Sequence, residues 1–256
     1  MTRLAFRFYQ ELNDFLPPGR RQREFEHWIN GRASVKDAIE ALGVPHTEVD
    51  LILVSGQSVG FDRLLQDGDR VSVFPRFESL DISPLLHLRP APLRQPRFVL
   101  DGHLGRLAAY LRLFGFDCLY DADWDDDTLA TLSAEGERLL LTRDRGLLKR
   151  KAVTRGYCPR QTHPRRQLVE VLRRFDLLGA SRPLSRCMVC NGLLEEVGKA
   201  QILGSLPPAV AREQEEFQRC RGCGRIYWRG SHHARLTDLI EAVRLELGKE
   251  EDFRGA

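Results

Sequence analysis

The chain has 256 residues, of which 42% are hydrophobic and 29% are charged, with a formal net charge of +3. This length suffices for two or three small domains with hydrophobic cores. No apolar run approaches the roughly 18 residues of a membrane span. The N-terminal sequence MTRLAFRFYQ lacks the apolar stretch typical of a signal peptide. We therefore expect a cytoplasmic protein that does not enter a membrane.

Residues 1–80 have the pattern of a small α+β domain. Ser34 is suited to cap a helix with Asp37 three positions later, and Gly43 is suited to end it. Apolar patterns on either side of this helix predict strands at 4–8, 24–28, 51–54 and 71–74. The expected order of elements is therefore β-β-α-β-β.

This order, together with LVSGQ at 53–57 and DGDRV at 67–71, resembles the ubiquitin-like β-grasp fold of small sulfur-carrier proteins. Sulfur carriers end in a Gly-Gly tail that is adenylated and thiolated. Here the last strand continues through Pro75 into more protein, which argues against sulfur-relay chemistry. The resemblance instead implies a domain that docks on a protein partner or grips a substrate.

A linker and an α/β domain follow. Four prolines within 81–96 cannot continue a helix or a central strand, so this segment is expected to be a linker. Between 97 and 180, helical patterns alternate with strands predicted at 98–101, 118–120, 138–142 and 153–157. Such alternation indicates a parallel sheet, whose ligands gather at the carboxyl ends of the strands. Asp101 and Asp144 lie at two of these ends.

Charges are unevenly distributed along this domain. Residues 117–127 include six Asp and no Lys or Arg, whereas residues 143–174 include eleven Lys or Arg and two acids. An acidic pocket beside a basic wall fits cations together with a polyanion. Two solvated faces of opposite sign are the alternative interpretation. Asp126 is expected to cap the helix that follows the acidic cluster.

Carboxylates at strand ends suggest metal-dependent cleavage of a phosphodiester. Mg²⁺ or Mn²⁺ held by carboxylates activates water and neutralises charge that develops on the phosphate. Arg143 and Arg145 flank Asp144, and Arg106 lies just over one helical turn beyond Asp101. All three arginines are candidates to bind phosphate, although a solvated surface would explain them equally well.

Residues 181–256 contain two Cys-x-x-Cys pairs. Four thiolates at this spacing predict a closed tetrahedral Zn²⁺ site, with the ligands Cys187, Cys190, Cys220 and Cys223. A closed site has no open position for catalysis, so this zinc is expected to be structural. The remaining cysteines, Cys118 and Cys158, are expected to be buried apolar residues.

The C-terminal segment contains an aromatic pair and a helix. Tyr227, Trp228 and Arg229 follow the second cysteine pair and are candidates to stack on bases. Alternatively, Trp228 pins the zinc-binding segment to the α/β domain. The apolar residues from Leu236 to Leu247 fall on one helical face, and the helix is predicted to end at Gly248 before a frayed tail.

The segments FVLDGHLGRLA at 98–108, DDTL at 126–129 and LLTRD at 140–144 resemble the PIN-like RNase domain of the Mut-seven C-terminal RNase family. Relatives in this family append a four-cysteine zinc ribbon, and some bacterial members carry a ubiquitin-like domain in front. The resemblance thus extends over nearly the whole chain. It implies a catalytic Mg²⁺ or Mn²⁺ site with the ligands Asp101, Asp126 and Asp144.

PIN-type sites usually include one further acid, and here Asp121, Asp123 and Asp125 all remain candidates. From the residues and the resemblance together, we expect a metal-dependent ribonuclease whose partner is RNA. The alternative is a non-catalytic RNA- or ribosome-binding adaptor with a degenerate PIN-like site.

Overall fold

The structure is a computed structural model that describes residues 1–75 and 96–254, with side chains described to residue 248. The described residues fall into two compact units. The first unit consists of residues 1–75 and 124–158, and the second of residues 96–123 and 159–254. Apart from its last residue, the predicted linker at 81–96 lies outside the described residues.

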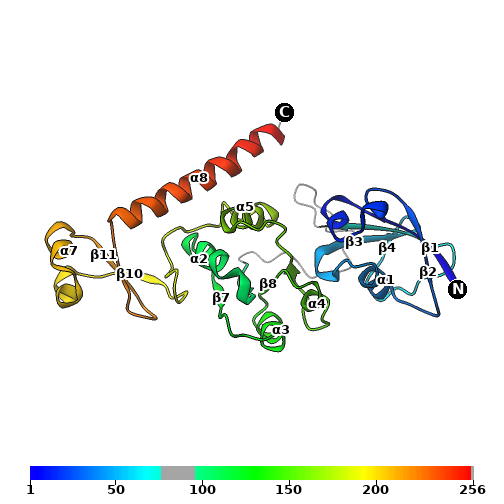
Figure 1. Cartoon of the computed structure of the whole chain (residues 1–256), viewed down its shortest axis with the longest axis horizontal. Coiled ribbons are helices and arrows are strands. Elements are labelled where there is room, and N and C mark those ends of the chain that lie inside the picture. The colour runs from blue at the N-terminus through cyan, green and yellow to red at the C-terminus, as the bar shows by residue number, and fades with distance from the viewer. Residues whose placement is uncertain (76–95, 255–256) are drawn as a thin grey trace. The chain divides into compact units, whose positions relative to one another are not determined.

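The N-terminal part of the first unit is a five-stranded mixed sheet with one helix packed against it (Figure 1). The strand order is β2-β1-β5-β3-β4, in which β1 pairs with β5 in parallel and the other pairs are antiparallel. The strands are β1 (Thr2–Phe8), β2 (Phe25–Ile29), β3 (Val49–Val54), β4 (Gln57–Ser58) and β5 (Arg70–Pro75). The predicted β-β-α-β-β order is confirmed, with β4 as an additional short strand.

Helix α1 (Val35–Ala41) begins where the sequence predicts. The Ser34 side chain accepts a hydrogen bond from the Asp37 amide at 3.1 Å, and the Asp37 carboxylate accepts one from the Ser34 amide at 3.3 Å. This reciprocal pair satisfies two amides that the first helical turn leaves unpaired. Gly43, at φ +100°, adopts the left-handed conformation just beyond the helix.

Three short 3₁₀ helices complete this part of the first unit: η1 (Gln10–Phe15), η2 (Pro18–Arg20) and η3 (His46–Glu48). The core between the sheet and α1 is apolar and aromatic. Phe6 and Phe8 are at most 1% exposed, and their rings stack with centroids 5.9 Å apart. Ile39 of α1 is fully buried.

The rest of the first unit is an α/β segment. Its strands β8 (Leu139–Leu141) and β9 (Gly156–Tyr157) pair in parallel. Helix α3 (Asp126–Glu135) precedes β8, and the short helix α4 (Arg145–Leu148) follows it. In sequence, each helix therefore connects to a strand of this parallel pair, as the alternating pattern predicts.

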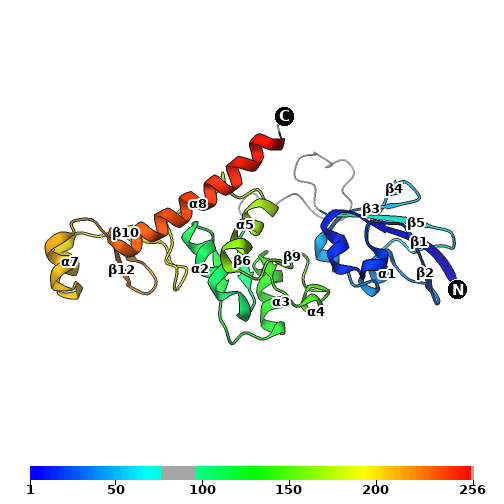
Figure 2. The same cartoon turned by 45° about the horizontal axis from the view of Figure 1, so that its top comes forward.

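The second unit contains another parallel pair, β6 (Phe98–Leu100) with β7 (Cys118–Tyr120). Helix α2 (Gly105–Leu113) connects the two strands and packs against α5 (Pro164–Arg174) (Figure 2). The apolar face of α5 is buried, whereas Arg166 on the same helix is exposed. Cys118 and Cys158 are buried, as predicted.

A three-stranded antiparallel sheet forms the ribbon at the end of the second unit, in the order β10-β11-β12. Its strands are β10 (Leu194–Glu196), β11 (Phe217–Cys220) and β12 (Ile226–Trp228). Between β10 and β11 lie α6 (Lys199–Ile202), the 3₁₀ helix η6 (Leu203–Ser205) and α7 (Pro208–Glu213).

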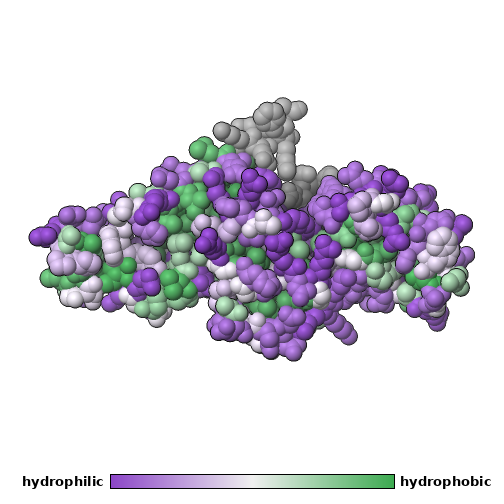
Figure 3. Space-filling model, viewed as in Figure 1, coloured by the Kyte–Doolittle hydropathy of each residue, from purple (hydrophilic) through white to green (hydrophobic). Residues whose placement is uncertain are grey.

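The ribbon has a small core of its own, made by Val197, Ile202 and Phe217. Trp228 packs against this core, so it helps to hold the ribbon together. Hydrophobic residues also reach the surface around α7 (Figure 3), and Leu203 is 54% exposed.

Helix α8 (Ser231–Arg254) ends the described chain. The prediction that this helix stops at Gly248 is wrong, because the helix continues through that residue. An isolated glycine costs a helix about 1 kcal/mol relative to alanine, which does not force it to end.

The fold-class prediction is confirmed: a β-grasp domain, parallel strands with connecting helices, and a ribbon that carries the cysteines. Among the described residues, no helix is long and apolar enough to span a bilayer.

Substitution of Ser34 by Ala is expected to destabilise the β-grasp domain by about 1 kcal/mol, because the Asp37 amide loses its acceptor. Urea unfolding followed at the amide signals of α1 measures this change. Ser34→Asn, which keeps a capping oxygen, should remain within a few tenths of a kcal/mol of the wild type. Equal losses in both variants would contradict the role of the cap.

Candidate functional site

The first candidate acid, Asp101, follows β6 and precedes a tight turn, η5 (Gly102–Leu104). The Tyr120 hydroxyl donates to the Gly102 carbonyl at 2.9 Å. A Cβ atom at Gly105 would lie 2.6 Å from the same hydroxyl, so this position requires glycine unless Tyr120 moves. A tyrosine at the end of β7 thus fixes the turn that carries Asp101.

Asp101 has two notable neighbours in the second unit. Its side chain is 13% exposed, and its Oδ2 atom lies 3.3 Å from Nε2 of the exposed His103. In the parallel pair, Leu100 is opposite Tyr120, so Asp101 and Asp121 leave the same end of adjacent strands. Two carboxylates therefore share this edge.

Asp144 begins α4 in the first unit. Its Oδ1 atom accepts hydrogen bonds from the amides of Gly146 at 2.6 Å and Leu147 at 3.3 Å, and its own amide donates to Thr142 Oγ1 at 2.9 Å. One carboxylate oxygen is thus engaged in a helix cap, and Oδ2 is outside these bonds. The residue is exposed, which leaves it accessible to a ligand.

The cap of α3 differs from the prediction. Asp125, rather than Asp126, is the N-cap: its Oδ1 atom accepts from the Thr128 amide at 2.8 Å. In a run of three aspartates each residue can serve as a cap, so the pattern alone does not select one. Hydrogen bonds from the Thr128 side chain and backbone hold the pKa of Asp125 below its ordinary value.

Asp126 is the first residue of α3 and half-buried. The Arg150 guanidinium lies 3.6 Å from its Oδ2 atom and also forms an ion pair with Asp127. The charge of Asp126 is therefore partly balanced by Arg150, a contact that the sequence pattern did not predict. It shares the first unit with Asp144, whereas Asp101 belongs to the second.

The three arginines that were predicted to bind phosphate have different surroundings. Arg106 on α2 and Arg143 after β8 are exposed. The guanidinium of Arg145 lies over the Phe15 ring, 4.9 Å from its centroid, in a cation–π contact within the first unit. Arg145 is exposed like the other two, but its guanidinium is held in this contact.

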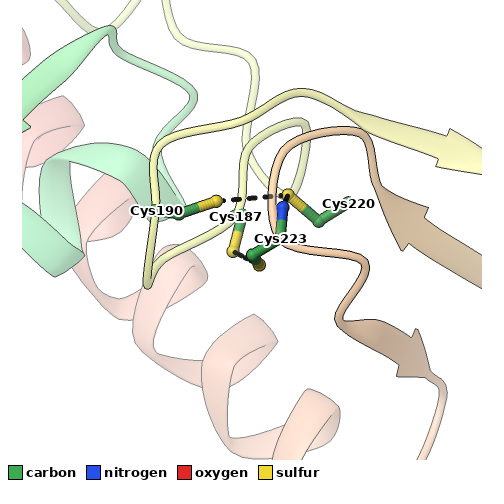
Figure 4. A group of neighbouring side chains, drawn as sticks. All are labelled: Cys187, Cys190, Cys220 and Cys223. Atoms are coloured by element: carbon green, nitrogen blue, oxygen red, sulfur yellow. Dashed lines mark hydrogen bonds between the residues drawn. The ribbon is translucent and has the colours of Figure 1, made fainter.

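The second candidate site is the group of four cysteines predicted from the two Cys-x-x-Cys pairs. The sulfur atoms lie within 4.8 Å of one another and point toward a common centre (Figure 4). The Sγ atoms of Cys187 and Cys223 are 3.7 Å apart, and those of Cys190 and Cys220 are 3.3 Å apart. A tetrahedral ion with metal–sulfur bonds of about 2.3 Å requires sulfur separations of about 3.8 Å. This group can therefore hold a metal ion, and its donor set suits zinc.

The thiols of this group have different environments. Burial opposes ionisation of Cys187, but the Tyr227 hydroxyl, 3.0 Å from its sulfur, and backbone amides lower its pKa to about 6. Burial raises the pKa of Cys190 to about 12. Because metal ligands are thiolates, a metal that binds here displaces the proton of Cys190.

The turn that carries the first cysteine pair, residues 187–191, is called the first cysteine knuckle. It is hydrogen-bonded to β7, the strand that leads to Asp121. The Asn191 side chain accepts from the Cys118 amide at 3.0 Å and donates to the Asp117 carboxylate at 2.9 Å. Asp117, the only acid between Asp101 and Asp121, therefore makes a structural contact. The buried Arg112 donates to the carbonyls of Cys118 and Val189, at 2.9 and 2.7 Å.

The roles of Asn191 and Arg112 were not predicted from the sequence. Asn191 has a positive φ of 71°, a conformation in which Asn is enriched, and it precedes a glycine, so a turn was the only available signal. Arg112 lies in α2 among apolar residues, and nothing in the sequence marks it as buried.

The fold is an α/β region with parallel strands, with a β-grasp domain before it and a four-cysteine ribbon after it. The family model described as Mut7-C RNAse domain matches residues 96–240, and the model described as Mut7-C ubiquitin matches residues 1–81. Because the first match covers more than half of the chain, this protein belongs to the Mut7-C RNAse domain family.

One solved structure is also similar. It is the crystal structure of small archaeal modifier protein 1 of H. volcanii, which is 18% identical. The match covers 30% of this chain and 100% of that chain, with a TM-score of 0.25. No curated protein matches the chain.

Replacement of Asp125 by Ala is expected to lower the urea midpoint of the first unit, because the Thr128 amide loses its acceptor. Asp126→Ala should lower it less, since it leaves the cap in place. The folded-state pKa of Asp125 is depressed, so its stabilisation is present above the ordinary value of 3.8 and lost as the pH falls through the folded-state pKa. The difference between wild type and Asp125→Ala should therefore shrink in acid, and a difference independent of pH would contradict this role.

Proposed function

We propose that this protein is a metal-dependent ribonuclease in which Asp101, Asp126 and Asp144 hold Mg²⁺ or Mn²⁺. The observation that carries the proposal is the match of residues 96–240 to an RNAse domain family, in a chain whose strands β6 and β8 lead into acids. Carboxylate oxygens are the ligands that these hard cations prefer. A bound ion would supply an activated water and neutralise charge on the phosphate.

Asp121 is the fourth acid in this proposal. It leaves the same strand end as Asp101, because Leu100 and Tyr120 are paired in register. Asp117 precedes β7 at the opposite end of that strand and is bonded to Asn191, whereas Asp123 and Asp125 lie further along the chain toward α3. Of the acids between Asp101 and Asp126, Asp121 therefore has the position most suited to join Asp101.

The residues of this chain would orient the reacting groups. The amides of Gly146 and Leu147 hold Oδ1 of Asp144, which limits rotation of the carboxylate and would leave Oδ2 to bind the metal ion. His103 lies close enough to Asp101 to orient its carboxylate. Arg106 and Arg143, both exposed, would contact phosphates of the RNA. Arg145 is assigned a lesser role here because its guanidinium lies over Phe15.

One observation favours the alternative, a non-catalytic RNA- or ribosome-binding adaptor. Arg150 lies beside Asp126 and Asp127, so a cation of the protein itself neutralises part of the acid set. In an adaptor, this pair would be permanent and no metal would enter. In an enzyme, Asp126 would exchange Arg150 for the metal, which their 3.6 Å separation and partial exposure permit.

Asp144→Asn is expected to lower Mn²⁺-dependent cleavage of single-stranded RNA by more than about 100-fold, beyond the 10- to 100-fold loss typical of residues behind metal ligands. The fold should be unchanged, because Asn keeps the oxygen that accepts from Gly146 and Leu147. Gel-resolved time courses and circular dichroism measure the two effects.

Asp127→Asn is the control, since Asp127, like Asp144, is an exposed aspartate of the first unit, but it is not a proposed ligand. It should retain wild-type cleavage. Full activity in Asp144→Asn would overturn the assignment. RNA binding by the wild type without metal-stimulated products would favour the adaptor.

We further propose that the cysteine group holds one structural Zn²⁺. The purified chain should contain one zinc per molecule by elemental analysis, and Cys190→Ser should contain less than one tenth of that and lose the ordered signals of β10–β12. Cys158→Ser, which changes a buried cysteine outside the group, should keep its zinc. Normal zinc content in Cys190→Ser would contradict the four-cysteine ligand set.

A further inference from the structure

The β-grasp domain contacts the segment 145–158, which begins directly after Asp144. Both belong to the first unit, and Figures 1 and 2 show α4 on the side of this domain. Besides the contact of Arg145 with Phe15, the Lys149 ammonium donates to the Glu40 carbonyl at 2.7 Å. The two ends of α4 are thus both held by the N-terminal domain.

His46 of η3 makes a third contact with this segment. Its side chain is 7% exposed, and its Nδ1 and Nε2 atoms lie 2.6 Å from Glu40 Oε1 and 2.9 Å from the Val153 carbonyl oxygen. The ring therefore bridges the Glu40 carboxylate and the Val153 backbone through its two nitrogen atoms. The Phe61 ring packs edge-on against the imidazole, with centroids 5.7 Å apart. His46 is therefore fixed in orientation toward the backbone at Val153.

Glu48, at the other end of η3, makes the fourth contact. It is 2% exposed, and its Oε1 atom accepts from the Cys158 amide at 2.6 Å. A buried carboxylate is costly unless hydrogen bonds compensate it. The amide immediately after β9 is one of the groups that stabilise this carboxylate, and removal of either partner would cost the other this hydrogen bond.

These contacts connect to Asp144 through the strand pair. The Thr142 amide donates to the Tyr157 carbonyl at 3.2 Å, next to the amide held by Glu48. Thr142 Oγ1 in turn accepts from the Asp144 amide. A continuous path of hydrogen bonds therefore runs from Glu48 through the end of β9 and the end of β8 to Asp144.

We propose that Glu48 and His46 are positioning residues of the nuclease site, and that the β-grasp domain is a fixed part of the enzyme. This inference rests on the proposed function. Both residues bond to backbone atoms of the segment 145–158, so they specify its register as well as its contact with the domain. An apolar contact alone would permit sliding, whereas a buried carboxylate and imidazole aimed at single backbone atoms do not.

The test compares full-length Glu48→Ala and Glu48→Gln with the wild type. In Glu48→Ala, exchange of the amide hydrogens of β9 and Cys158 should quicken at least 10-fold, and kcat for RNA should fall about 10- to 100-fold with KM within 2-fold. Glu48→Gln keeps an oxygen that can accept from Cys158, so it should restore most of both properties. His46→Ala should behave like Glu48→Ala.

Glu26→Ala is the matched control, because Glu26 is an exposed acid on β2 of the same domain. It should leave exchange at 145–158 and cleavage unchanged. If exchange in this segment does not respond to Glu48→Ala or His46→Ala, the contact does not hold the segment and the proposal is overturned. If exchange quickens but kcat does not change, the contact holds the segment without positioning Asp144, which also overturns it.

The exchange measurement keeps this inference separate from the proposed function. If the wild type cleaves no RNA, the ribonuclease assignment fails, and the claim that these residues hold the segment is then decided by hydrogen exchange alone. Exchange limited to 145–158, with unchanged protection in β1 and β5, also distinguishes a local effect from unfolding of the domain.

Discussion

The guanidinium of Arg112 is buried, and it donates to the carbonyls of Cys118, Met188 and Val189. A charge that is removed from water is tolerated only when such partners replace its hydration. These three carbonyls belong to the start of β7 and to the first cysteine knuckle, so one side chain of α2 joins both. The ribbon that carries the four cysteines and the strand that leads to Asp121 thus depend on the same buried cation.

This dependence links the two candidate sites of the second unit. Asn191 adds two further hydrogen bonds between the knuckle and the start of β7, through the Cys118 amide and Asp117. At the other end of the strand, Tyr120 fixes the turn after Asp101. The three-residue strand β7 is therefore held at its first residue, Cys118, by the ribbon. Its last residue, Tyr120, is hydrogen-bonded to Gly102, next to Asp101. If the first cysteine knuckle became disordered, β7 would lose the hydrogen bonds at its first residue, and Asp121 at its other end is only three residues away.

Local patterns were sufficient to predict most elements of the fold. The capping box of Ser34 and Asp37 is an interaction over three residues, and the two Cys-x-x-Cys pairs carry their spacing in the sequence. The cap of α3 was assigned to the wrong aspartate because neighbouring acids offer the same chemistry, and only the backbone geometry selects Asp125. The helices α6 and α7 between the cysteine pairs were not predicted, because the three-residue core of this insert is too small to give a periodic signal.

The contacts that tie the N-terminal domain to the segment 145–158 could not be predicted in this way. Glu48 and Cys158 are 110 positions apart, and His46 and Val153 are 107 apart. No spacing rule relates such positions, and a histidine and a glutamate after a proline resemble an ordinary surface turn. Likewise, the pairing of Asp101 with Asp121 at one edge follows from strand register, which the sequence does not specify.

The separation of Glu48 from Cys158 also has a consequence for biogenesis. During synthesis the N-terminal domain leaves the ribosome first, and domains generally fold in that order. Its α1 and η3 would form while Val153 and Cys158, more than 100 residues downstream, are still untranslated. For that interval two ionisable side chains remain in water and keep this face of the domain hydrated. The same polar groups that later fix the register of the segment 145–158 thus spend the first part of synthesis exposed to water.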